Sequence, residues 1–336
     1  MKLSDFNYTL PPGLIAQHPL VHRERARMMV IDRLTKEIRH DYFLNIEKYI
    51  PAKALFVIND SKVVPARLIG HMEKTGREVE VFLLNALEGG YRYRTLLRPL
   101  KKIKYDERII FDNTTLWAKL IDHEKRIVEF NKKNIMAYLT KIGHMPLPPY
   151  IRRDDEPSDR KDYQTVYAKP LGSVAAPTAG LHFTKKILRD LKASGHGFGR
   201  VTLHVNYGTF HPVQEEDITR HQMHYEDYNI PSATVNILKK AKERDQKVIG
   251  VGTTSCRVLE AYAKTGEVKG STNLFAYPGF SFKMVDLLLT NFHLPKSTLL
   301  MLVCAFADTS FVMKAYAEAI KEKYRFYSYG DCMLII

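Results

Sequence analysis

Cysteine is scarce in this 336-residue chain. The three cysteines, Cys256, Cys304 and Cys332, are far apart, and none belongs to a C-x-x-C pair. This spacing supports neither a disulfide framework nor a zinc knuckle. Cys304 lies in an apolar segment, where a cysteine packs as a small hydrophobic residue. We therefore expect a reducing, cytoplasmic environment.

Long hydrophobic runs are also missing. The longest, residues 299–307, is well short of the roughly 20 residues that a membrane-spanning helix needs. The first twenty residues contain polar residues and prolines where a signal peptide has an apolar core. We expect neither a signal sequence nor a membrane partner.

Acidic residues are outnumbered by basic ones. The chain has 51 Lys and Arg against 37 Asp and Glu, a net charge of +14, and its pI is near 9.4. A strongly basic chain is a candidate for binding polyanions such as nucleic acid, although a cationic surface can also serve solubility alone. With 45% hydrophobic residues and enough length for about two domains, the chain can bury a sizeable core.

The segment Asp286–Ala307 organises the rest of the sequence. Its apolar residues 287–289 predict a strand that is buried on both faces, and a polar loop, Asn291–Pro295, follows. Ser297 or Thr298 can cap a helix that is apolar all round and must be buried. Ligands bind beside such strand–loop–helix units in α/β sheets, although an ordinary core unit has the same pattern.

The region from residue 63 to about residue 127 has a different pattern. Short alternating or β-branched runs are separated by turn residues, which predicts a small antiparallel barrel. The predicted architecture is an α/β main domain, residues 1–62 and 146–336, with an inserted small antiparallel β-barrel domain, residues 63–145. Residues 143–163 are rich in proline and charge. We interpret them as a connector whose mixed charges, Arg152–Glu156, form a solvated face.

The predicted barrel carries the densest basic run of the chain. No acidic residue interrupts it, and Tyr91, Tyr93 and Tyr105 are interleaved with it. Basic side chains can follow phosphates while aromatic rings stack on unpaired bases, so we expect RNA contact. A basic edge that prevents sheet association is the alternative. The run consists of Arg92, Arg94, Arg98, Lys101, Lys102 and Lys104.

Several loops of the main domain contain residues suited to ligand binding. The small residues of 173–184 allow close approach to a ligand, and Thr184 can cap the helix that follows. Gly252–Arg257 enters a helix, an arrangement suited to an anion or a hydroxyl-rich ligand, with Arg257 available for a carboxylate. Asn59 and Asp60 are either ligand groups or turn caps. Gly195–Gly199 follows a helix instead of a strand, so it is no dinucleotide or methyltransferase fingerprint.

The segment around His224 allows two interpretations. His221 and His224 have a spacing that can hold a metal ion on a helix, but no further ligand is clustered nearby, so we expect no metal. Alternatively, His224 and Glu226 lie on one face of a strand. That arrangement suits acid–base chemistry, or forms only a structural hydrogen bond.

Ordered sequence blocks across essentially the whole chain carry a family resemblance. Together they resemble the S-adenosylmethionine:tRNA ribosyltransferase-isomerases of queuosine biosynthesis. Four positions depart from the pattern expected of that family: Lys53, Asn206, Leu287 and Asp308. The blocks are DFNYTLPPGLIAQHPL, VINDSKVVPARLIG, SVAAPTAGLHFT, HVNYGTFHPV, MHYEDY, VGTTSCRVLE, YPGFSFKMVDLLLTNFHLPKSTLLMLV and YRFYSYGDCMLI.

The resemblance implies a specific reaction. The ribosyl part of S-adenosylmethionine is transferred to the aminomethyl group of 7-aminomethyl-7-deazaguanine in a tRNA anticodon loop and isomerised, which gives epoxyqueuosine-tRNA and releases adenine and methionine. S-adenosylmethionine is a co-substrate, with no metal or other cofactor, and a cytoplasmic monomer is expected. Alternatives are a non-catalytic tRNA-binding protein and an S-adenosylmethionine-dependent RNA methyltransferase.

These chemical needs and the matching blocks suggest the site residues. A general base, a proton donor for adenine and partners for the amino-acid end of S-adenosylmethionine are required. The expected catalytic residues are His182, His224, Glu226, His293 and Asp331, with Asp331 meeting the aminomethyl ammonium. The expected substrate-binding residues are Thr178, Gly180, Thr253, Thr254, Ser255, Arg257 and Asn291, and the basic run of the barrel is expected to bind tRNA.

Overall fold

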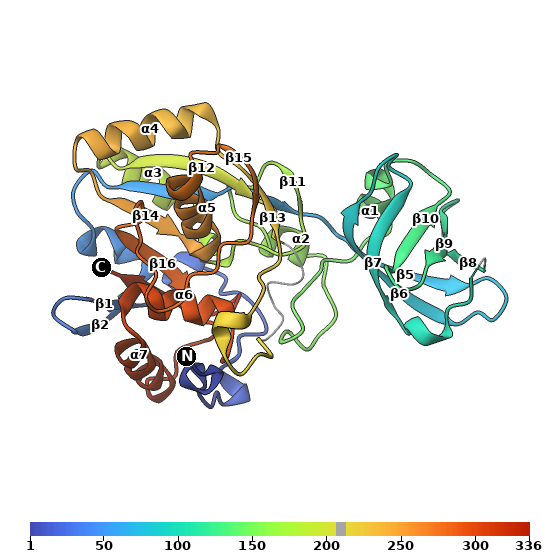
Figure 1. Cartoon of the computed structure of the whole chain (residues 1–336), viewed down its shortest axis with the longest axis horizontal. Helices are drawn as coiled ribbons and strands as arrows, with labels where there is room; N and C mark the ends of the chain where they lie inside the picture. The colour runs from blue at the N-terminus through green and yellow to red at the C-terminus, as the bar shows by residue number, and fades with distance from the viewer. Residues whose placement is uncertain (106, 206–212) are drawn as a thin grey trace. The chain divides into compact units, whose positions relative to one another are not determined.

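The computed structural model describes residues 1–105, 107–205 and 213–336 (Figure 1). Two compact units make up the chain. The α/β unit consists of Met1–Lys62, Pro149–Arg153 and Gln164–Ile336, and the barrel unit of Val63–Pro148 and Asp154–Tyr163. The expected α/β fold with an inserted small antiparallel barrel is confirmed.

The α/β unit is built on a nine-stranded mixed sheet with the order β15-β13-β12-β3-β14-β16-β17-β1-β2. Strands β12, β3, β14 and β16 run parallel, so their carboxyl ends meet at one edge of the sheet. In sheet order the strands are β15 (Lys269–Thr272), β13 (Glu226–Asn229), β12 (Gly197–Leu203), β3 (Leu55–Asn59), β14 (Val248–Val251), β16 (Leu287–Asn291), β17 (Cys332–Ile335), β1 (Arg27–Ile31) and β2 (Ile38–Tyr42). Lys62–Val63 (β4) and Leu171–Ser173 (β11) form a separate two-stranded sheet.

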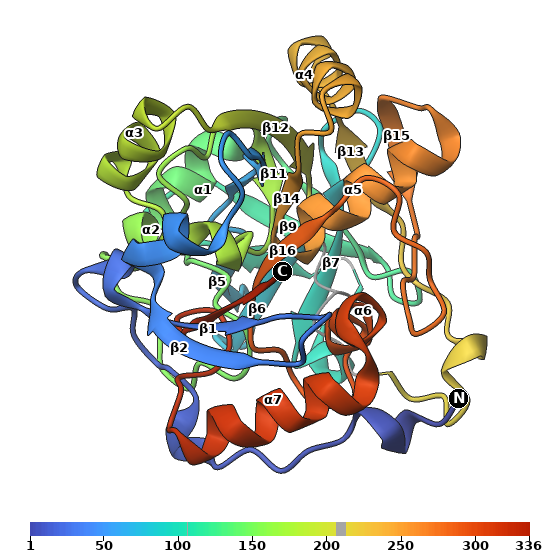
Figure 2. The same cartoon turned by 90° about the vertical axis from the view of Figure 1, so that its left-hand side faces the viewer.

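The sheet separates two hydrophobic cores because successive strand side chains point to opposite faces. In β3, Leu55 and Val57 belong to one core and Phe56 and Ile58 to the other. Helices α4 (Ser232–Glu243), α5 (Gly252–Thr265), α6 (Thr298–Ala307) and α7 (Thr309–Lys321) contribute to the first core. Helix α3 (Lys185–Ala193) and the 3₁₀ helices η4 (Phe43–Tyr49) and η6 (Thr178–His182) contribute to the second. Figure 2 shows α7 and α3 on opposite sides of the sheet.

The predicted strand–loop–helix unit is present. All five residues of β16 are buried, and the Ser297 hydroxyl caps α6 by accepting a hydrogen bond from the Leu300 amide at 3.2 Å. Asp308 connects α6 to α7 with φ +79°, a conformation that favours glycine, and its carboxylate caps α7. In the described part of the chain no single helix has the length and hydropathy of a membrane span. Among the helices of the described ranges, only the bent pair α6 and α7, taken together, meets that criterion.

The glycine-rich segment Gly195–Gly199 leads into β12. Gly197 and Gly199 belong to the strand itself. Gly199 faces Thr234 of α4, where an added Cβ would lie 3.0 Å from the threonine methyl. The small residues therefore let α4 pack closely on β12.

The barrel unit is a closed six-stranded barrel with the order β10-β7-β6-β5-β8-β9. At Gly70 of β5 an added Cβ would lie 2.7 Å from the carbonyl oxygen of Ile110, so glycine permits the close pairing of β5 with β8. The elements are β5 (Arg67–Met72), β6 (Glu78–Ala86), β7 (Arg92–Arg98), β8 (Arg108–Ile110), β9 (Trp117–Asp122), β10 (Ile127–Phe130) and the helices α1 (Met136–Ile142) and α2 (Asp159–Asp162).

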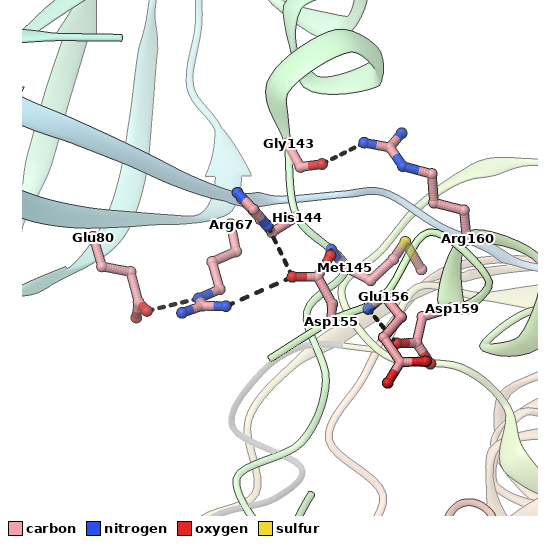
Figure 3. Close-up of polar contacts among 9 residues, drawn as sticks. All are labelled: Arg67, Glu80, Gly143, His144, Met145, Asp155, Glu156, Asp159 and Arg160. Atoms are coloured by element: carbon pink, nitrogen blue, oxygen red, sulfur yellow. Dashed lines mark hydrogen bonds and ion pairs between the residues drawn. The ribbon is translucent and has the colours of Figure 1, made fainter. Parts of the chain in front are cut away.

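The expectation that the charged residues 152–156 form one solvated face is wrong for Asp155 (Figure 3). The Asp155 side chain is 8% exposed, and its carboxylate accepts hydrogen bonds from the Met145 amide and from His144 Nδ1, both at 2.8 Å. Arg67 lies 3.8 Å from the same carboxylate and donates to Glu80 at 2.7 Å. The segment Asp154–Tyr163 is thus fixed to the barrel strands by a partly buried charge network.

Candidate functional site

A cavity lies at the carboxyl edge of the parallel strands in the α/β unit. Its volume is about 60 Å³, which is room for a few water molecules, so it fits one end of a larger substrate. The segments that follow β12, β14 and β16 all contribute to it, as expected for an α/β sheet. The lining residues are Tyr150, Ala176, Pro177, Thr178, Ala179, Val205, Gly252, Thr253, Thr254, Thr290, Asn291, Phe292, His293, Leu294, Ser297, Leu299, Tyr327 and Ser328.

Two helix N-termini face this cavity. Helix α5 begins at Gly252, directly after β14, and Val251 precedes it, so the helix has no side-chain cap hydrogen bond from any described residue. Its first N–H groups therefore lack the partner that Ser297 gives to α6. Thr253 and Thr254 line the cavity in this first turn. The arrangement favours an anionic group, such as a carboxylate, at the start of α5.

Asn291, at the end of β16, supplies an orphaned acceptor. Its Nδ2 lies within hydrogen-bonding distance of three acceptors, the carbonyl oxygens of Tyr327 (3.1 Å) and Asp331 (3.3 Å) and the ring nitrogen Nε2 of His182 (3.3 Å). This environment fixes the amide orientation, and Oδ1 has no partner among the described residues. A buried unpaired acceptor costs roughly 1–3 kcal/mol, so the geometry suits a ligand N–H or O–H donor. The buried hydroxyl of Thr254 likewise has no hydrogen-bond partner among the described residues.

His182 lies behind Asn291. It is buried, and burial lowers its pKa to about 4, with the positive charge of Arg23 acting in the same direction. Its Nε2 accepts from Asn291, a backbone hydrogen bond joins it to Arg23, and its ring lies 5.5 Å from that of Phe43. The imidazole is therefore neutral and held at both ends, an arrangement that orients Asn291.

His293 lies in the wall of the cavity itself. Its Nε2 is 2.7 Å from the hydroxyl of Thr290, and Nδ1 makes no hydrogen bond to a described residue. Burial lowers the pKa of His293 to about 3, so the ring is neutral near pH 7 and one of its nitrogens is available to accept a proton. It is the one predicted catalytic residue that lines the cavity within the described chain.

Tyr327 marks the site by backbone strain. Its φ of +69° is rare for a bulky residue, and such strain concentrates at functional sites. Its carbonyl holds Asn291, and its ring packs 4.6 Å from that of Tyr150. The sequence analysis missed Tyr327, Tyr150 and Ser328, because nothing local in the sequence identifies a positive φ or a contact between residues 150 and 328.

Glu226 and Arg257 bind each other and do not line the cavity. They form a buried ion pair with side chains 2% and 3% exposed, and Arg257 also donates to the Leu274 carbonyl at 3.0 Å. The hypothesis that His224 and Glu226 share one strand face is wrong, because His224 is exposed and precedes β13 whereas Glu226 is buried within it.

Three further predicted residues lie outside the cavity lining. The Asp331 carboxylate accepts hydrogen bonds from the backbone amides of Arg27 (2.9 Å) and Arg325 (2.8 Å), and burial raises its pKa. Gly180 packs against Tyr167, whose hydroxyl oxygen would lie 2.1 Å from an added Cβ. Ser255 is fully buried in α5. In the described cavity, Thr178, Thr253, Thr254, Asn291 and His293 are the predicted residues that come together.

The basic run lies on the barrel unit. Arg92, Arg94 and Arg98 are exposed on one face of β7, and Lys101, Lys102 and Lys104 are exposed beyond its end. Arg92 is paired with Glu129 at 2.8 Å. Among the described residues, no group of three His, Cys, Asp or Glu side chains could hold a metal, and His221 contacts Glu215. Asn206 lies outside the described residues.

The fold and the cavity define an α/β protein with a candidate ligand site at the carboxyl edge of its sheet and an inserted barrel. The model of the queuosine biosynthesis protein family matches residues 3–335, and the chain belongs to that family. Relatives named S-adenosylmethionine:tRNA ribosyltransferase-isomerase include one from Sulfurihydrogenibium sp., 50% identical with both chains fully covered. Another, from Natranaerobius thermophilus, is 47% identical over 100% of this chain and 99% of its own.

A solved structure also resembles this chain. The crystal structure of an S-adenosylmethionine tRNA ribosyltransferase from Thermotoga maritima is 38% identical, with a TM-score of 0.58. The match covers 99% of this chain and 100% of the other. The likeness therefore extends over both units.

Proposed function

We propose that this protein is an S-adenosylmethionine:tRNA ribosyltransferase-isomerase. It transfers the ribosyl moiety of S-adenosylmethionine to the aminomethyl group of 7-aminomethyl-7-deazaguanine in a tRNA anticodon loop and isomerises it, giving epoxyqueuosine-tRNA, adenine and methionine. The observation that carries the proposal is the cavity in which Asn291, His293 and the uncapped start of α5 meet. Full-length relatives of that name support it.

The amino-acid end of S-adenosylmethionine fits the charges of the cavity. Its carboxylate is attracted to the N–H groups at the start of α5, and the orphaned Thr254 hydroxyl can donate to it. Its ammonium group can donate to Asn291 Oδ1. Arg257 is already paired with Glu226, so it is not the carboxylate partner in this proposal.

His293 is the proposed proton-transfer residue. The positive sulfur acidifies the adjacent C5′ protons, and a neutral imidazole can take one of them through Nδ1. The electron pair left on C5′ moves through the ribose ring to the glycosidic bond, so adenine leaves with the pair of that bond and takes a proton from the imidazolium. The aminomethyl nitrogen supplies the pair for the new bond to the ribosyl group and loses a proton, and methionine leaves with the C5′–S pair as a neutral thioether. These steps therefore require no electron acceptor. We propose S-adenosylmethionine as a consumed co-substrate with no further cofactor, acting in a cytoplasmic monomer.

The exposed basic run of β7 and the residues after it is the proposed phosphate contact for tRNA. Arg94, Arg98, Lys101, Lys102 and Lys104 are exposed on the barrel unit. Phosphate contacts of this kind position an RNA without reading its sequence.

The decisive experiment follows two labels. S-adenosylmethionine labelled in adenine or in the methyl group is mixed with precursor tRNA, and free adenine and methylated RNA are measured. We expect adenine release in proportion to modified tRNA and no methyl label on RNA. Methylated RNA would indicate a methyltransferase, and binding without adenine release would indicate a tRNA-binding protein; either result contradicts the proposal.

One variant tests the role of the cavity in the same assay. We expect His293→Ala to lower the rate of adenine release by at least about 100-fold, the usual contribution of a general acid or base. A rate close to that of the unmodified protein would exclude His293 as the proton-transfer residue. His22→Ala, at an exposed position outside the cavity lining, is the matched control and should leave the rate unchanged.

A further inference from the structure

Two tyrosine hydroxyls hold the backbone of His293. The His293 amide donates a hydrogen bond to the hydroxyl oxygen of Tyr316 at 3.0 Å, and the His293 carbonyl accepts one from the hydroxyl of Tyr8. Tyr8 follows η1 (Leu3–Phe6) near the start of the chain, and Tyr316 lies in α7. Both backbone polar groups of one loop residue are therefore bound by side chains from distant parts of the sequence.

The two tyrosines pack against each other, with Tyr316 fully buried and Tyr8 partly buried. Their rings are in edge contact with centroids 5.2 Å apart. Burial raises the pKa of both phenols, so both keep their protons across the physiological range. Each hydroxyl can therefore serve as a permanent hydrogen-bonding group, because neither phenol becomes a charged phenolate near neutral pH.

The rest of the loop is restrained as well. The ring of Phe292 lies 5.4 Å from Tyr316, 5.4 Å from Tyr324 and 5.0 Å from Phe326, and its carbonyl accepts from the Tyr327 amide at 3.2 Å. With the backbone fixed and Nε2 bonded to Thr290, the imidazole has little freedom. The direction of Nδ1 is thereby set by the protein before a substrate binds.

We propose that Tyr8 and Tyr316 are positioning residues that aim His293 Nδ1 at the reacting part of the substrate. This inference rests on the proposed function. A proton transfer needs heavy atoms within hydrogen-bond reach, and a displacement of about 1 Å can lower a rate about 100-fold. The two hydroxyls touch no reacting atom in this role and act through the His293 peptide.

Tyr324 is the matched control for this inference. It lies in the same aromatic cluster beside Phe292, but its hydroxyl bonds Nδ1 of His40 at 2.8 Å instead of the His293 backbone. Tyr324→Phe therefore removes a buried phenol hydrogen bond of the same kind without releasing His293. Tyr8→Phe, Tyr316→Phe and Tyr324→Phe all keep their rings and the packing of the cluster.

The first test is single-turnover adenine release. We expect Tyr8→Phe and Tyr316→Phe each to lower the maximal rate by about tenfold or more while KM for S-adenosylmethionine stays within about twofold. The double variant should lose less than the product of the two single losses, because both hydroxyls hold one peptide group. Tyr324→Phe should retain the unmodified rate. Equal rate losses in all three variants, or none in the Tyr8 and Tyr316 variants, would overturn the inference.

A second measurement does not depend on activity. In protein labelled with ¹⁵N-histidine and free of substrate, the His293 ring should give one neutral tautomer that does not titrate between about pH 5 and 8. Tyr8→Phe or Tyr316→Phe should change the His293 amide and ring signals, whereas Tyr324→Phe should not. If the unmodified protein releases no adenine, the proposed function fails, while this spectrum still shows whether the tyrosines hold His293. Unchanged His293 signals in both variants would overturn the inference on its own.

Discussion

The α/β unit and the barrel unit carry their charge in different ways. The chain has 51 Lys and Arg residues and 37 Asp and Glu residues. The α/β unit contains 33 of the basic and 22 of the acidic residues, a net charge of +11. The barrel unit contains the other 18 basic and 15 acidic residues, a net charge of +3. The basic composition of the whole chain thus belongs mainly to the unit with the cavity. The barrel concentrates its cations locally, on β7 and the residues after it.

The units also differ in where they place ionised groups. In the α/β unit, Glu226 and Arg257 are withdrawn from water almost completely. In the barrel unit, Arg92 and Glu129 pair with side chains 55% and 41% exposed. A buried pair is strongly destabilised when one partner is removed, whereas an exposed pair contributes little. The comparison therefore predicts a large difference between two similar substitutions.

The largest expected effect belongs to Glu226→Gln. Removing the carboxylate leaves Arg257 charged and buried, which should destabilise the α/β unit by about 3–5 kcal/mol. Glu129→Gln in the barrel is the matched control and should cost at most about 1 kcal/mol. Hydrogen exchange measured separately on peptides of each unit checks both. Similar losses for the two variants would mean that the buried pair has no special role.

Acid should weaken the α/β unit more than the barrel. The pKa of His182 is lowered to about 4 and that of His293 to about 3, so the unfolded chain binds protons at these sites first. Each contributes stability that is present above about pH 6.5 and is lost, by up to about 1.4 kcal/mol per pH unit, as the pH falls toward the folded pKa. The histidines of the barrel unit are all partly exposed.

The acid effect is best measured as a difference. Burial raises the pKa of Asp331 and Glu260, which opposes the histidine effect at low pH. Denaturant unfolding of the unmodified protein and of His182→Gln, at pH 7.5 and 5, separates the two contributions. We expect a smaller loss on acidification in the variant. An equal loss of unfolding free energy in both proteins would show that His182 is not a neutral, buried group in the folded protein.

The sequence allowed the main architecture to be predicted because its signals are local. The apolar run of β16, the Ser297 cap and the apolar helix α6 are encoded within one short segment. The short alternating strands of the barrel are equally local. Asn291, His293 and Thr254 could be linked to one site because strands of an α/β sheet present their carboxyl ends at one edge.

The rest depends on contacts that no local pattern encodes. The sequence alone predicts that Arg257 is available for a ligand, because its partner Glu226 lies 31 positions away. Tyr8 meets His293 across 285 positions, and its sequence context gives no sign of it. The charges of Arg152–Glu156 were expected to form a solvated face, whereas Asp155 is bound by His144 and by the Met145 amide, 11 and 10 positions earlier in the chain.

The charge network of Asp155 allows a smaller test within the barrel. Asp155→Asn replaces a carboxylate that accepts from the Met145 amide and from His144, so the barrel unit should lose about 1–3 kcal/mol. The rate of backbone hydrogen exchange should rise first in residues 154–163. Asp112→Asn, whose side chain is 68% exposed, is the control and should stay within about 0.5 kcal/mol. Unchanged protection in Asp155→Asn would show that the segment is held by its other interactions.

The smallest expected effect concerns RNA binding. It compares the contribution of the barrel's local cations to tRNA binding with that of the larger net charge of the α/β unit. Arg94 and Arg98 have no ion pair with a described residue, whereas Arg92 is already paired with Glu129. If β7 binds phosphates, Arg94→Gln with Arg98→Gln should reduce the dependence of log affinity on log salt by about 0.7–0.9 for each phosphate that is no longer neutralised, and Arg92→Gln by less. Titrations of tRNA at several salt concentrations measure both slopes. An unchanged slope in the double variant would exclude Arg94 and Arg98 as phosphate contacts and would leave the phosphate binding to Lys101, Lys102 and Lys104 or to the α/β unit.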